Sequence, residues 1–258
     1  MSILTYKNFY RAYLDCRESK RGSASAVEFE IGLERNLSAL LTELRARKYE
    51  PGRSICFVAR EPKPREVFAA GFRDRVVHHL LVNELEEPGE RAFIHDSYAC
   101  RKKKGTHRAV ERMRLFLRRS RAGIEPLYFL QLDIDGFFMS IDKEILSSLV
   151  RKLIRKQKRS ATWKEEVSWL AETIIRHDPT KNYQMNSPPA FFRLIPDRKS
   201  LFMQPPGKGL PIGNYSSQFF ANLYMNELDQ YVKGILKCKM YIRYVDDFIL
   251  LHHRPEVL

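Results

Sequence analysis

The chain has 258 residues, of which 44% are hydrophobic and 12% aromatic, a composition that supports a folded core without disulfides or structural metals. Its 45 Lys and Arg residues outnumber its 31 Asp and Glu residues and give a net charge of +14, which indicates a polyanionic partner such as nucleic acid. The four cysteines form no C-x-x-C pair and no apolar run reaches the roughly 18 residues of a membrane helix, so the sequence argues against a zinc site, a disulfide framework and a membrane span, and predicts a cytoplasmic protein.

The first part of the chain is predicted to form two helices followed by a hairpin. Apolar residues at helical spacing in the first 50 residues indicate two amphipathic helices, with Val27 and Ile31 among the positions expected to face inward. Residues 54–60, SICFVAR, have strand composition, the prolines of EPKPRE indicate a turn, and EVFAAGF returns as a second strand. The hairpin therefore has a basic tip that contains Lys63 and Arg65.

The middle of the chain is predicted to contain two helices, a strand and a third helix. Residues 74–87 and 107–121 have apolar residues at helical period, and Asp74 is placed to cap the first of these helices. Residues 126–140, PLYFLQLDIDGFFMS, begin as a buried strand, and Asp142 is placed to cap the helix that follows. The positions of that helix expected to face inward are Ile145, Leu149 and Leu153.

The last part of the chain is predicted to be a connection, a long helix and two strands. Residues 177–209 are rich in proline and polar residues and indicate a connection with short strands. Residues 214–236 have the pattern of a long helix. Residues 239–252, KMYIRYVDDFILLH, form two strands around Asp246 and Asp247.

Aspartates stand at the ends of these predicted strands. Asp246 and Asp247 are an unfavourable pair for a plain hairpin turn, because Asn-Gly or Asp-Gly suits such turns and adjacent carboxylates repel. Asp133 ends another strand, and a strand ending in Asp246 that lay beside it would bring the carboxylates into one site. Oxygen ligands suit Mg²⁺, and two ions about 3.5–4 Å apart can activate a 3′-hydroxyl and stabilise a leaving pyrophosphate. The alternative is a solvated Asp-Asp turn, with Asp133 or Asp135 capping a helix.

Two motifs around these aspartates resemble those of reverse transcriptases. Residues 244–247, Y-V-D-D, resemble the family's catalytic hairpin, and residues 132–138, L-D-I-D-G-F-F, resemble its first catalytic motif. The resemblance implies an RNA-directed DNA polymerase of the α+β class, with the right-hand fold of fingers and palm and an antiparallel palm sheet flanked by helices. It also implies that Asp133 and Asp246 are the principal ligands of two Mg²⁺ ions and that Asp247 supports them.

The resemblance assigns a nucleotide-binding role to further residues. Phe138 would be the bulky side chain that excludes a ribose 2′-OH. Lys63 and Arg65 would reach the triphosphate, although only Pro64 separates them where the family has a longer, glycine-containing tip. A solvated basic turn is the alternative for this pair. Residues placed against the incoming base pair by the resemblance are Ile212, Gly213 and Gln218.

Two segments resemble the family's fingers motifs: residues 72–81, FRDRVVHHLL, and residues 93–110, FIHDSYACRKKKGTHRAV. The resemblance implies that the residues contacting the template are Arg75, Ser97, Tyr98 and Arg101. Tyr98 could stack on a base, and the RKKK cluster could hold phosphates without reading sequence. The arginines of residues 107–121 are explained at least as well by a solvated helix face.

Residues 207–218, GKGLPIGNYSSQ, distinguish groups within the family. Most reverse transcriptases carry a glutamine and a proline at the positions where this chain has Ile212 and Gln218, and the pattern here is similar to the enzymes of diversity-generating retroelements. That resemblance implies error-prone copying of a template-repeat RNA, with frequent errors opposite adenine, in mutagenic retrohoming with a small basic accessory protein and a structured RNA. An apolar Ile212 cannot hold the nascent pair by hydrogen bonding, so discrimination against mispairs should weaken.

The predicted domain order is N-terminal helices and fingers in residues 1–123 and palm in residues 124–258. The family continues with a thumb, which is expected to be absent from this chain or supplied by another. The implied ligands are an RNA template, a DNA or RNA primer and deoxynucleoside triphosphates. Two other readings stay open, namely a defence-associated or otherwise domesticated prokaryotic reverse transcriptase and an RNA-binding scaffold that does not polymerise.

Overall fold

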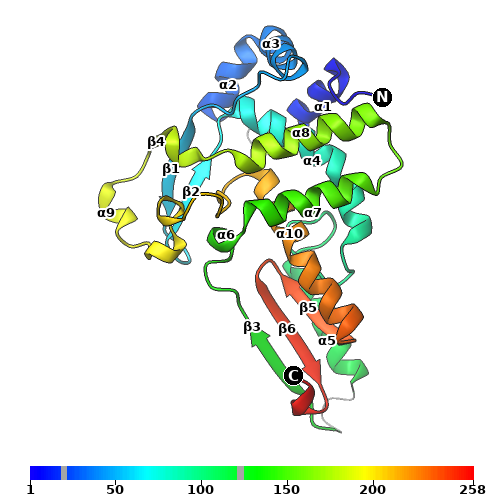
Figure 1. Cartoon of the computed structure of the whole chain (residues 1–258). Coiled ribbons are helices and arrows are strands. Elements are labelled where there is room, and N and C mark those ends of the chain that lie inside the picture. The colour runs from blue at the N-terminus through cyan, green and yellow to red at the C-terminus, as the bar shows by residue number, and fades with distance from the viewer. Residues whose placement is uncertain (19–21, 121–124) are drawn as a thin grey trace. The chain divides into compact units, whose positions relative to one another are not determined.

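The chain divides into two compact units, which are described separately below (Figure 1). The structure is a computed structural model that describes residues 1–18, 22–120 and 125–258. The first unit comprises Met1–Gly89 and Phe138–Ser217, and the second comprises Glu90–Phe137 and Gln218–Leu258. The predicted boundary between Gly123 and Ile124 lies outside the described residues, so the assignment of fingers and palm to residue ranges stays a prediction.

The N-terminal segment of the first unit contains three helices within the described residues, where two were predicted. They are α1 (Tyr6–Glu18), α2 (Ala24–Ile31) and α3 (Leu33–Arg45). The buried side of α2 is the one that carries Ala26 and Phe29. Val27 and Ile31 lie off this side and are 49% and 83% exposed, against the prediction.

The predicted hairpin of the first unit is confirmed. β1 (Ser54–Ala59) and β2 (Arg65–Ala69) pair in antiparallel orientation, and β4 (Tyr183–Met185) joins β1 in parallel orientation to give the order β2-β1-β4. Cys56 and Phe68 lie opposite each other in this register and are both buried in one hydrophobic cluster. Alternate residues of the hairpin therefore face a core, as a period of two requires.

Helix α4 (Phe72–Ala92) begins at Phe72, whereas a cap at Asp74 requires a helix that begins at Arg75. Asp74 lies inside the first turn, is buried, and accepts hydrogen bonds from the Tyr49 hydroxyl at 3.0 Å and the Gly52 backbone N–H at 2.8 Å. The prediction of an Asp74 cap is therefore wrong, because this carboxylate ties the segment before β1 to the helix instead. No described helix, including α4, has the length and apolar content that crossing a bilayer requires.

Helices α7 (Lys143–Arg155) and α8 (Ala161–Arg176) form a packed pair in the first unit (Figure 1). Asp142 caps α7 as predicted, because its carboxylate accepts hydrogen bonds from the backbone N–H groups of Glu144 at 2.9 Å and Ile145 at 3.1 Å. Ile145 itself is exposed, so its predicted inward position is wrong. The buried apolar residues of α7 are Leu146, Val150, Leu153 and Ile154, a stripe that begins one residue later.

The connection between α8 and the next long helix consists mainly of short helical turns. Besides β4 it contains η1 (Pro179–Lys181), α9 (Pro189–Phe192), η2 (Asp197–Lys199) and η3 (Leu201–Met203). The buried carboxylate of Glu66, on β2, accepts hydrogen bonds from the Ser200 hydroxyl at 2.8 Å and the Leu201 backbone N–H at 2.7 Å. This contact attaches the connection to the hairpin.

The second unit is built on an antiparallel sheet. Its strands are β3 (Tyr128–Leu132), β5 (Met240–Tyr244) and β6 (Asp247–His252), in the order β3-β6-β5. The helical elements with residues in this unit are α4, α5 (Thr106–Arg119), α6 (Phe137–Ser140), α10 (Tyr215–Gln230), its π-helical continuation η4 (Tyr231–Ile235), and η5 (Pro255–Val257). The two strands predicted around Asp246 and Asp247 are therefore confirmed.

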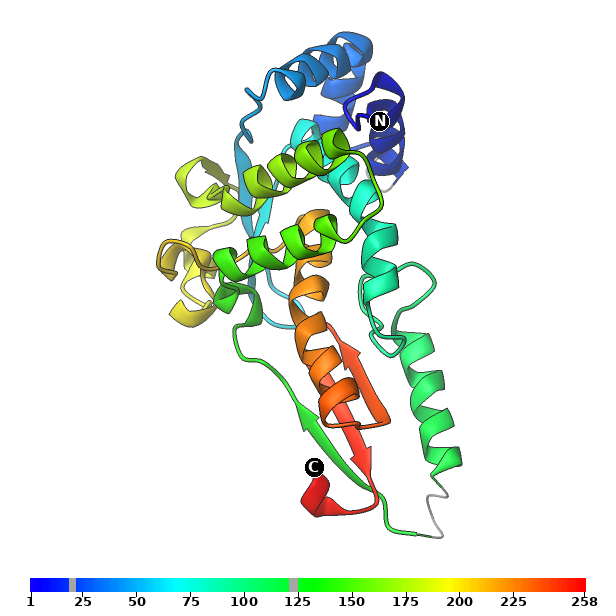
Figure 2. The ribbon, with the colours of Figure 1, turned by 45° about the vertical axis from the view of Figure 1, so that its right-hand side comes forward.

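Helices cover both faces of this sheet (Figure 2). On one face Tyr241 and Leu250 pack with Val232 of the π-helical continuation of α10. On the other face Ile242 and Leu251 pack with α5. Neighbouring residues of each strand point to opposite faces, so the apolar residues within YIRYVDDFILL pack against helices on both faces of the sheet.

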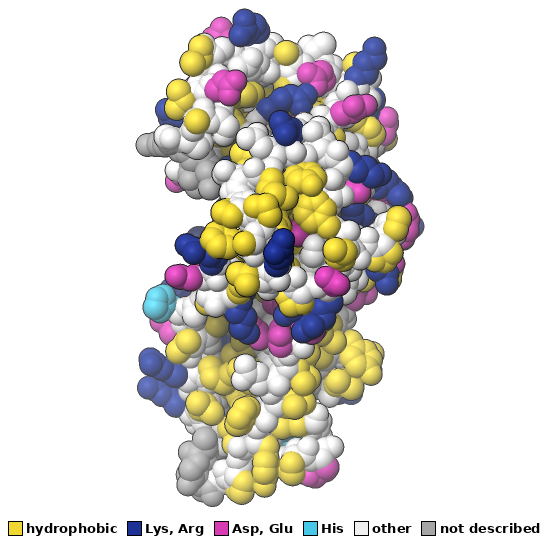
Figure 3. All heavy atoms as spheres, turned by 90° about the vertical axis from the view of Figure 1, so that its left-hand side faces the viewer, with side chains coloured by type: hydrophobic (Ala, Val, Ile, Leu, Met, Phe, Trp, Pro, Cys, Tyr) yellow, Lys and Arg dark blue, Asp and Glu magenta, His cyan; other side chains and the backbone are white. Residues whose placement is uncertain are grey.

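Strand β3 is exposed, where a buried strand was predicted. Its residues include Tyr128, Phe129 and Leu132, and Phe129 is 70% exposed. Hydrophobic side chains are visible at the surface of the face shown in Figure 3. The physical reason is position in the sheet, because β3 is an edge strand that pairs only with β6 among the described strands.

Candidate active site

The carboxylates of Asp133, Asp246 and Asp247 come together at one end of the sheet of the second unit. Each offers one oxygen, and these oxygens all lie within 4.8 Å of one another. The sequence predicted that the strand ending in Asp246 would lie beside the strand ending in Asp133. The structure differs in detail, because β6, which begins at Asp247, lies between β3 and β5.

The register of the strands explains this convergence. Leu132, the last residue of β3, pairs with Phe248, so Asp133 directly after the strand reaches the level of Asp247 on β6. Tyr244 pairs with Asp247, which leaves Val245 and Asp246 as the two residues of the turn. The three carboxylates therefore come from the end of one strand, from the turn, and from the first residue of the middle strand.

The donor chemistry of this cluster fits a divalent cation. Asp133 and Asp247 are exposed and Asp246 is half-buried. Three like charges so close together repel one another unless a cation neutralises them, and Mg²⁺ prefers carboxylate oxygens. Among the described residues, this is the one group of three or more His, Cys, Asp or Glu side chains that converges in this way.

The turn that carries Asp246 has a strained backbone. Val245 has φ of 58°, in the left-handed region. The first residue of such a two-residue loop is usually glycine, and a β-branched residue there costs on the order of 1–3 kcal/mol. A strained residue persists only where its surroundings hold it, so the contacts of this turn decide its conformation.

A buried arginine contacts the turn from β5. Arg243 Nε and Nη2 donate hydrogen bonds to the two carboxylate oxygens of Asp229 at 2.8 Å and 2.7 Å, and both side chains are 0% exposed. Arg243 Nη1 donates to the backbone carbonyl of Val245 at 2.8 Å and to Asn222 Oδ1 at 3.1 Å. Nη2 also donates to the Ser97 hydroxyl at 3.0 Å. The guanidinium thus joins α10, the loop before α5, and the turn.

Asp229 and Asn222, both on α10, make further contacts in this network. The Tyr241 hydroxyl donates to Asp229 at 2.7 Å, and burial together with the neighbouring carboxylate raises the pKa of Tyr241 far above its usual range. Asn222 Nδ2 donates to the Ala99 carbonyl at 2.9 Å. The tyrosine therefore stays a neutral donor to Asp229.

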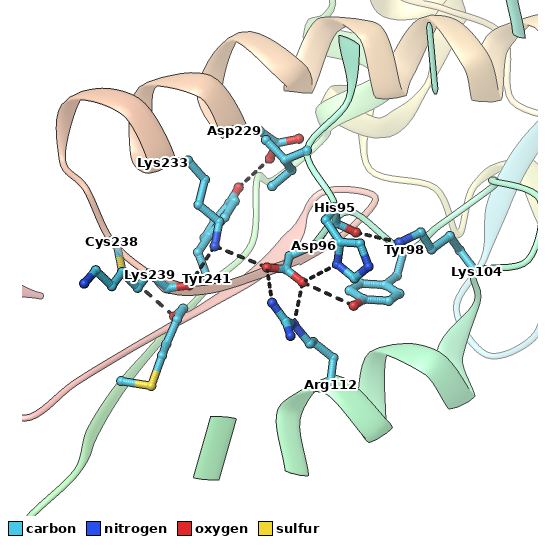
Figure 4. Close-up of polar contacts among 12 residues, drawn as sticks. His95, Asp96, Tyr98, Lys104, Arg112, Asp229, Lys233, Cys238, Lys239 and Tyr241 are labelled. Atoms are coloured by element: carbon cyan, nitrogen blue, oxygen red, sulfur yellow. Dashed lines mark hydrogen bonds and ion pairs between the residues drawn. The ribbon is translucent and has the colours of Figure 1, made fainter. Parts of the chain in front are cut away.

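A second buried carboxylate, Asp96, holds the loop before α5 (Figure 4). It accepts hydrogen bonds from Arg112 at 2.7 Å and 3.2 Å and from the Tyr98 hydroxyl at 3.2 Å, while Lys233 lies 3.3 Å away and His95 Nδ1 3.0 Å away. Burial by itself would raise the pKa of Asp96, but the Arg112 hydrogen bond, with His95 and Lys233, holds that pKa below its ordinary value. Asp96 is therefore ionised at neutral pH.

The predicted template residues of the second unit make contacts inside the protein. The Ser97 hydroxyl accepts from Arg243, and Tyr98 is 2% exposed with Lys104 Nζ 4.9 Å from its ring centre. Arg101 donates to both carboxylate oxygens of Glu90, at 2.9 Å and 2.7 Å, and to two backbone carbonyls. These three side chains thus shape the loop before α5, and their contact with a template stays a prediction. Arg75, the fourth, is half-buried on α4 of the first unit.

The predicted triphosphate contacts lie on the hairpin of the first unit. Lys63 is exposed in the loop between β1 and β2. Arg65 is also exposed, but it is the first residue of β2 rather than part of the loop. Both side chains are accessible to a ligand.

Other predicted nucleotide contacts gather at the opposite end of β2. Phe138 and Ile212 are partly buried against the cluster that contains Cys56 and Phe68, and the Ile212 carbonyl accepts a hydrogen bond from the Phe68 backbone N–H at 2.8 Å. Gly213 has φ of 118°, and a Cβ there would lie 2.6 Å from a side-chain carbon of the neighbouring strand. A glycine is therefore required at this position. Gln218 is exposed on the part of α10 that belongs to the second unit.

Sequence reasoning missed the Arg243–Asp229 pair. The signal was present, because Arg243 is two residues from Tyr241 and therefore shares its face of an otherwise apolar strand. A cation on a buried face needs an acid nearby. The identity of that acid, Asp229 on α10, does not follow from the strand pattern.

Comparison with known proteins agrees with this fold. The family model for reverse transcriptase (RNA-dependent DNA polymerase) matches residues 62–258, and the chain therefore belongs to the reverse transcriptase family. The predicted α+β class, with an antiparallel sheet flanked by helices, is confirmed. No curated protein matches the chain significantly.

Several solved structures are similar to the chain. A telomerase from Candida tropicalis truncated from its C-terminal domain has a TM-score of 0.51 and 12% identity, over 80% of this chain and 44% of that one. A telomerase from Candida albicans in complex with a fragment of telomeric RNA has a TM-score of 0.52 and 10% identity, over 83% and 40%. A partial Cas6-RT-Cas1–Cas2 complex has a TM-score of 0.48 and 18% identity, over 98% and 38%. The chain spans less than half of the telomerase chains, and the likeness to them shows the fold alone.

Proposed function

We propose that the chain carries the catalytic centre of an RNA-directed DNA polymerase, which extends a primer along an RNA template. The observation that carries this proposal is the convergence of the Asp133, Asp246 and Asp247 carboxylate oxygens to within 4.8 Å of one another. The family assignment supports it, because the matched residues include the whole cluster. The net charge of +14 supports a polyanionic partner.

In this proposal the aspartates hold two Mg²⁺ ions, with Asp133 and Asp246 as the principal ligands and Asp247 in support. Mg²⁺ bound there supplies Lewis-acid activation of the primer 3′-hydroxyl and neutralises charge on the triphosphate. The fold of the chain places the three aspartates where they can bind the ions together. The pairing of β3 with β6 aligns Asp133 with Asp247, and the turn presents Asp246, so the ligands need little rearrangement to bind.

The remaining predicted residues would bind the nucleotide and the template. Lys63 and Arg65 supply mobile cations for the triphosphate. Phe138 supplies bulk against a ribose 2′-OH, and Gly213 lets the backbone pass close to a base pair. The full sets in this proposal are Lys63, Arg65, Phe138, Ile212, Gly213 and Gln218 for the nucleotide, and Arg75, Ser97, Tyr98 and Arg101 for the template.

The finer form of the proposal is error-prone synthesis in mutagenic retrohoming of a diversity-generating retroelement. Ile212 supports it, because this half-buried apolar side chain cannot hold a nascent pair by hydrogen bonding. The partners in this form are a structured template RNA and a small basic accessory protein. Errors are expected opposite template adenines.

The test is primer extension on an adenine-containing RNA template with Mg²⁺, followed by sequencing of the products. Asp246→Ala should abolish extension, while Asp197→Ala, which removes an exposed carboxylate from η2, should leave it unchanged. Extension that survives Asp246→Ala would refute the proposed centre. Its absence from the unaltered protein, with accessory protein supplied, would favour a non-polymerising scaffold.

The error spectrum tests the finer form. Ile212→Gln should lower misincorporation opposite adenine, and Ile212→Leu, which keeps an apolar side chain, should not. Accurate copying by the unaltered protein would instead favour a defence-associated or otherwise domesticated reverse transcriptase.

A further inference from the structure

The turn that carries Asp246 is restrained by a side chain outside the carboxylate cluster. We propose that Arg243 is a positioning residue: its guanidinium holds the Val245 carbonyl and thereby keeps the turn in the conformation in which Asp246 meets Asp133 and Asp247. This inference rests on the proposed function, because that function requires the three carboxylates to bind metal together.

The backbone of the turn needs such a restraint. Val245 has φ of 58°, a conformation that β-branched residues rarely adopt. A free turn would relax toward negative φ, which would rotate the peptide between Val245 and Asp246 and move the Asp246 carboxylate away from its neighbours. The observed convergence within 4.8 Å therefore depends on contacts that oppose this relaxation.

Arg243 supplies a rigid contact of this kind. Its Nη1 group lies 2.8 Å from the Val245 carbonyl oxygen, and its other nitrogens bind both oxygens of Asp229. Asn222 and Ser97 accept two more of its hydrogen bonds. A planar guanidinium fixed at this many points has a single orientation, and a lysine ammonium cannot reproduce that fork.

The backbone of Arg243 is fixed as well as its side chain. Arg243 pairs with Phe248 of β6, the residue directly after Asp247. On its other side the Arg243 N–H donates to the Asp96 carbonyl at 3.0 Å, and its carbonyl accepts from the Tyr98 N–H at 3.0 Å. The base of the turn therefore cannot shift, so the Val245 contact transmits a fixed position to the next residue.

Weaker metal binding is the expected consequence of losing this contact. Partners that orient metal ligands typically contribute about 10–100-fold in metal affinity or activity. Arg243→Lys keeps the charge beside Asp229 but loses the fork. It should weaken metal binding about tenfold, at the lower end of that range, because the carboxylates themselves remain.

The experiment measures binding of Mn²⁺ to the full chain by electron paramagnetic resonance, beside the Mg²⁺ concentration for half-maximal primer extension. Arg243→Lys should raise the Mn²⁺ dissociation constant and the half-maximal Mg²⁺ concentration, each about tenfold. Tyr241→Phe is the matched control, because it removes another hydrogen bond to Asp229 without touching Val245. It should lower thermal stability and leave both metal values unchanged.

A compensating change tests the turn itself. Glycine adopts positive φ without strain, so Val245→Gly in the Arg243→Lys background should restore most of the lost metal affinity. If the loss persists undiminished in the double variant, Arg243 does not act through the turn conformation, and the inference is wrong.

The remaining outcomes separate this inference from the proposed function. If the Arg243→Lys variant binds Mn²⁺ as tightly as the unaltered chain, the role of Arg243 is wrong, while the proposed metal centre stands. An unaltered chain that binds no Mn²⁺ would overturn the metal centre itself. If Arg243→Lys fails to fold, the pair Arg243→Met with Asp229→Leu replaces the buried ions by apolar side chains, lacks the Val245 contact, and should show the same weakened binding.

Discussion

The second unit uses aspartates in two opposite ways. Asp229 and Asp96 are buried and lie against cations of the protein itself, at distances down to 2.7 Å. Asp133, Asp246 and Asp247 converge on one another at the end of the sheet. The first arrangement satisfies each charge within the fold, whereas the second concentrates charge that an external cation can neutralise.

The difference shows that the role of a carboxylate depends on what its neighbours supply. A buried acid without a cation would destabilise the protein, so Arg243, Arg112 and Lys233 are structural necessities. In the aspartate cluster two of the three carboxylates, Asp133 and Asp247, are exposed, so water and ions screen part of the repulsion. Residues of one type in one small unit thus divide into those that hold the fold and those that the fold presents to a ligand.

The largest expected effect on the free energy of unfolding comes from an Asp→Asn change, made once in a buried ion pair and once in the aspartate cluster. Asp229→Asn leaves the Arg243 charge buried without its partner and should cost about 3–5 kcal/mol of the free energy of unfolding. Asp247→Asn relieves repulsion in the exposed cluster and should leave that free energy unchanged or slightly raised. Urea denaturation of both variants measures the difference. Equal losses would show that the cluster is as structural as the buried pair.

The next effect extends the comparison to the first unit, where a buried group is neutral. Burial, with smaller contributions from His177, His79 and Arg75, lowers the pKa of His78 to about 3. The unfolded chain binds a proton at this residue near pH 6.5 and the folded chain does not. Stability should therefore fall as pH falls from 6.5 toward 3, by at most about 1.4 kcal/mol per pH unit from this group.

The measurement for His78 is the free energy of unfolding from pH 7 to pH 4. His78→Gln removes the titrating ring and should flatten the pH dependence over this window. His107→Gln, on the exposed surface of α5, is the control and should not. An unchanged slope in the first variant would contradict a neutral buried His78.

A comparable effect is expected from metal addition and removal. A cation that binds the folded state alone stabilises it by about 1.4 kcal/mol at ten times its dissociation constant. Mg²⁺ should therefore raise the unfolding temperature of the unaltered chain, and a chelator should reverse the rise. Asp133→Asn should abolish the response, while Asp142→Asn, at the cap of α7, should keep it. A response that survives Asp133→Asn would place the cation elsewhere.

The smallest effect on stability is expected at the hairpin tip. Lys63 is exposed, so Lys63→Ala should change the free energy of unfolding by no more than about 0.5 kcal/mol. If its charge contacts a triphosphate, the KM for deoxynucleotides should rise about two- to fivefold, the worth of one solvated ion pair. Lys181→Ala removes another exposed cation of the same unit and should alter neither value. Equal KM values for deoxynucleotides in Lys63→Ala and Lys181→Ala would show that Lys63 does not contact the triphosphate.

Local patterns in the sequence predicted much of the fold correctly. The alternating residues of β1 and β2 and the Asp142 cap were readable because their partners are near in sequence, at most 14 residues away in the hairpin and three at the cap. The failures had a shared cause. The exposure of β3 and of Ile31 depends on which elements cover them, and no local spacing contains that information.

The sequence by itself determined the elements around the aspartate motifs and the prediction that Asp133 would meet Asp246 and Asp247. Each motif places a carboxylate at the end of an apolar strand, and antiparallel pairing can bring such ends together. The tertiary structure alone decided that β6 lies between the other strands and that Arg243 finds its counter-ion in Asp229. The physical reason is that burial and ion pairing depend on long-range packing, whereas strand and turn preferences depend on neighbouring residues.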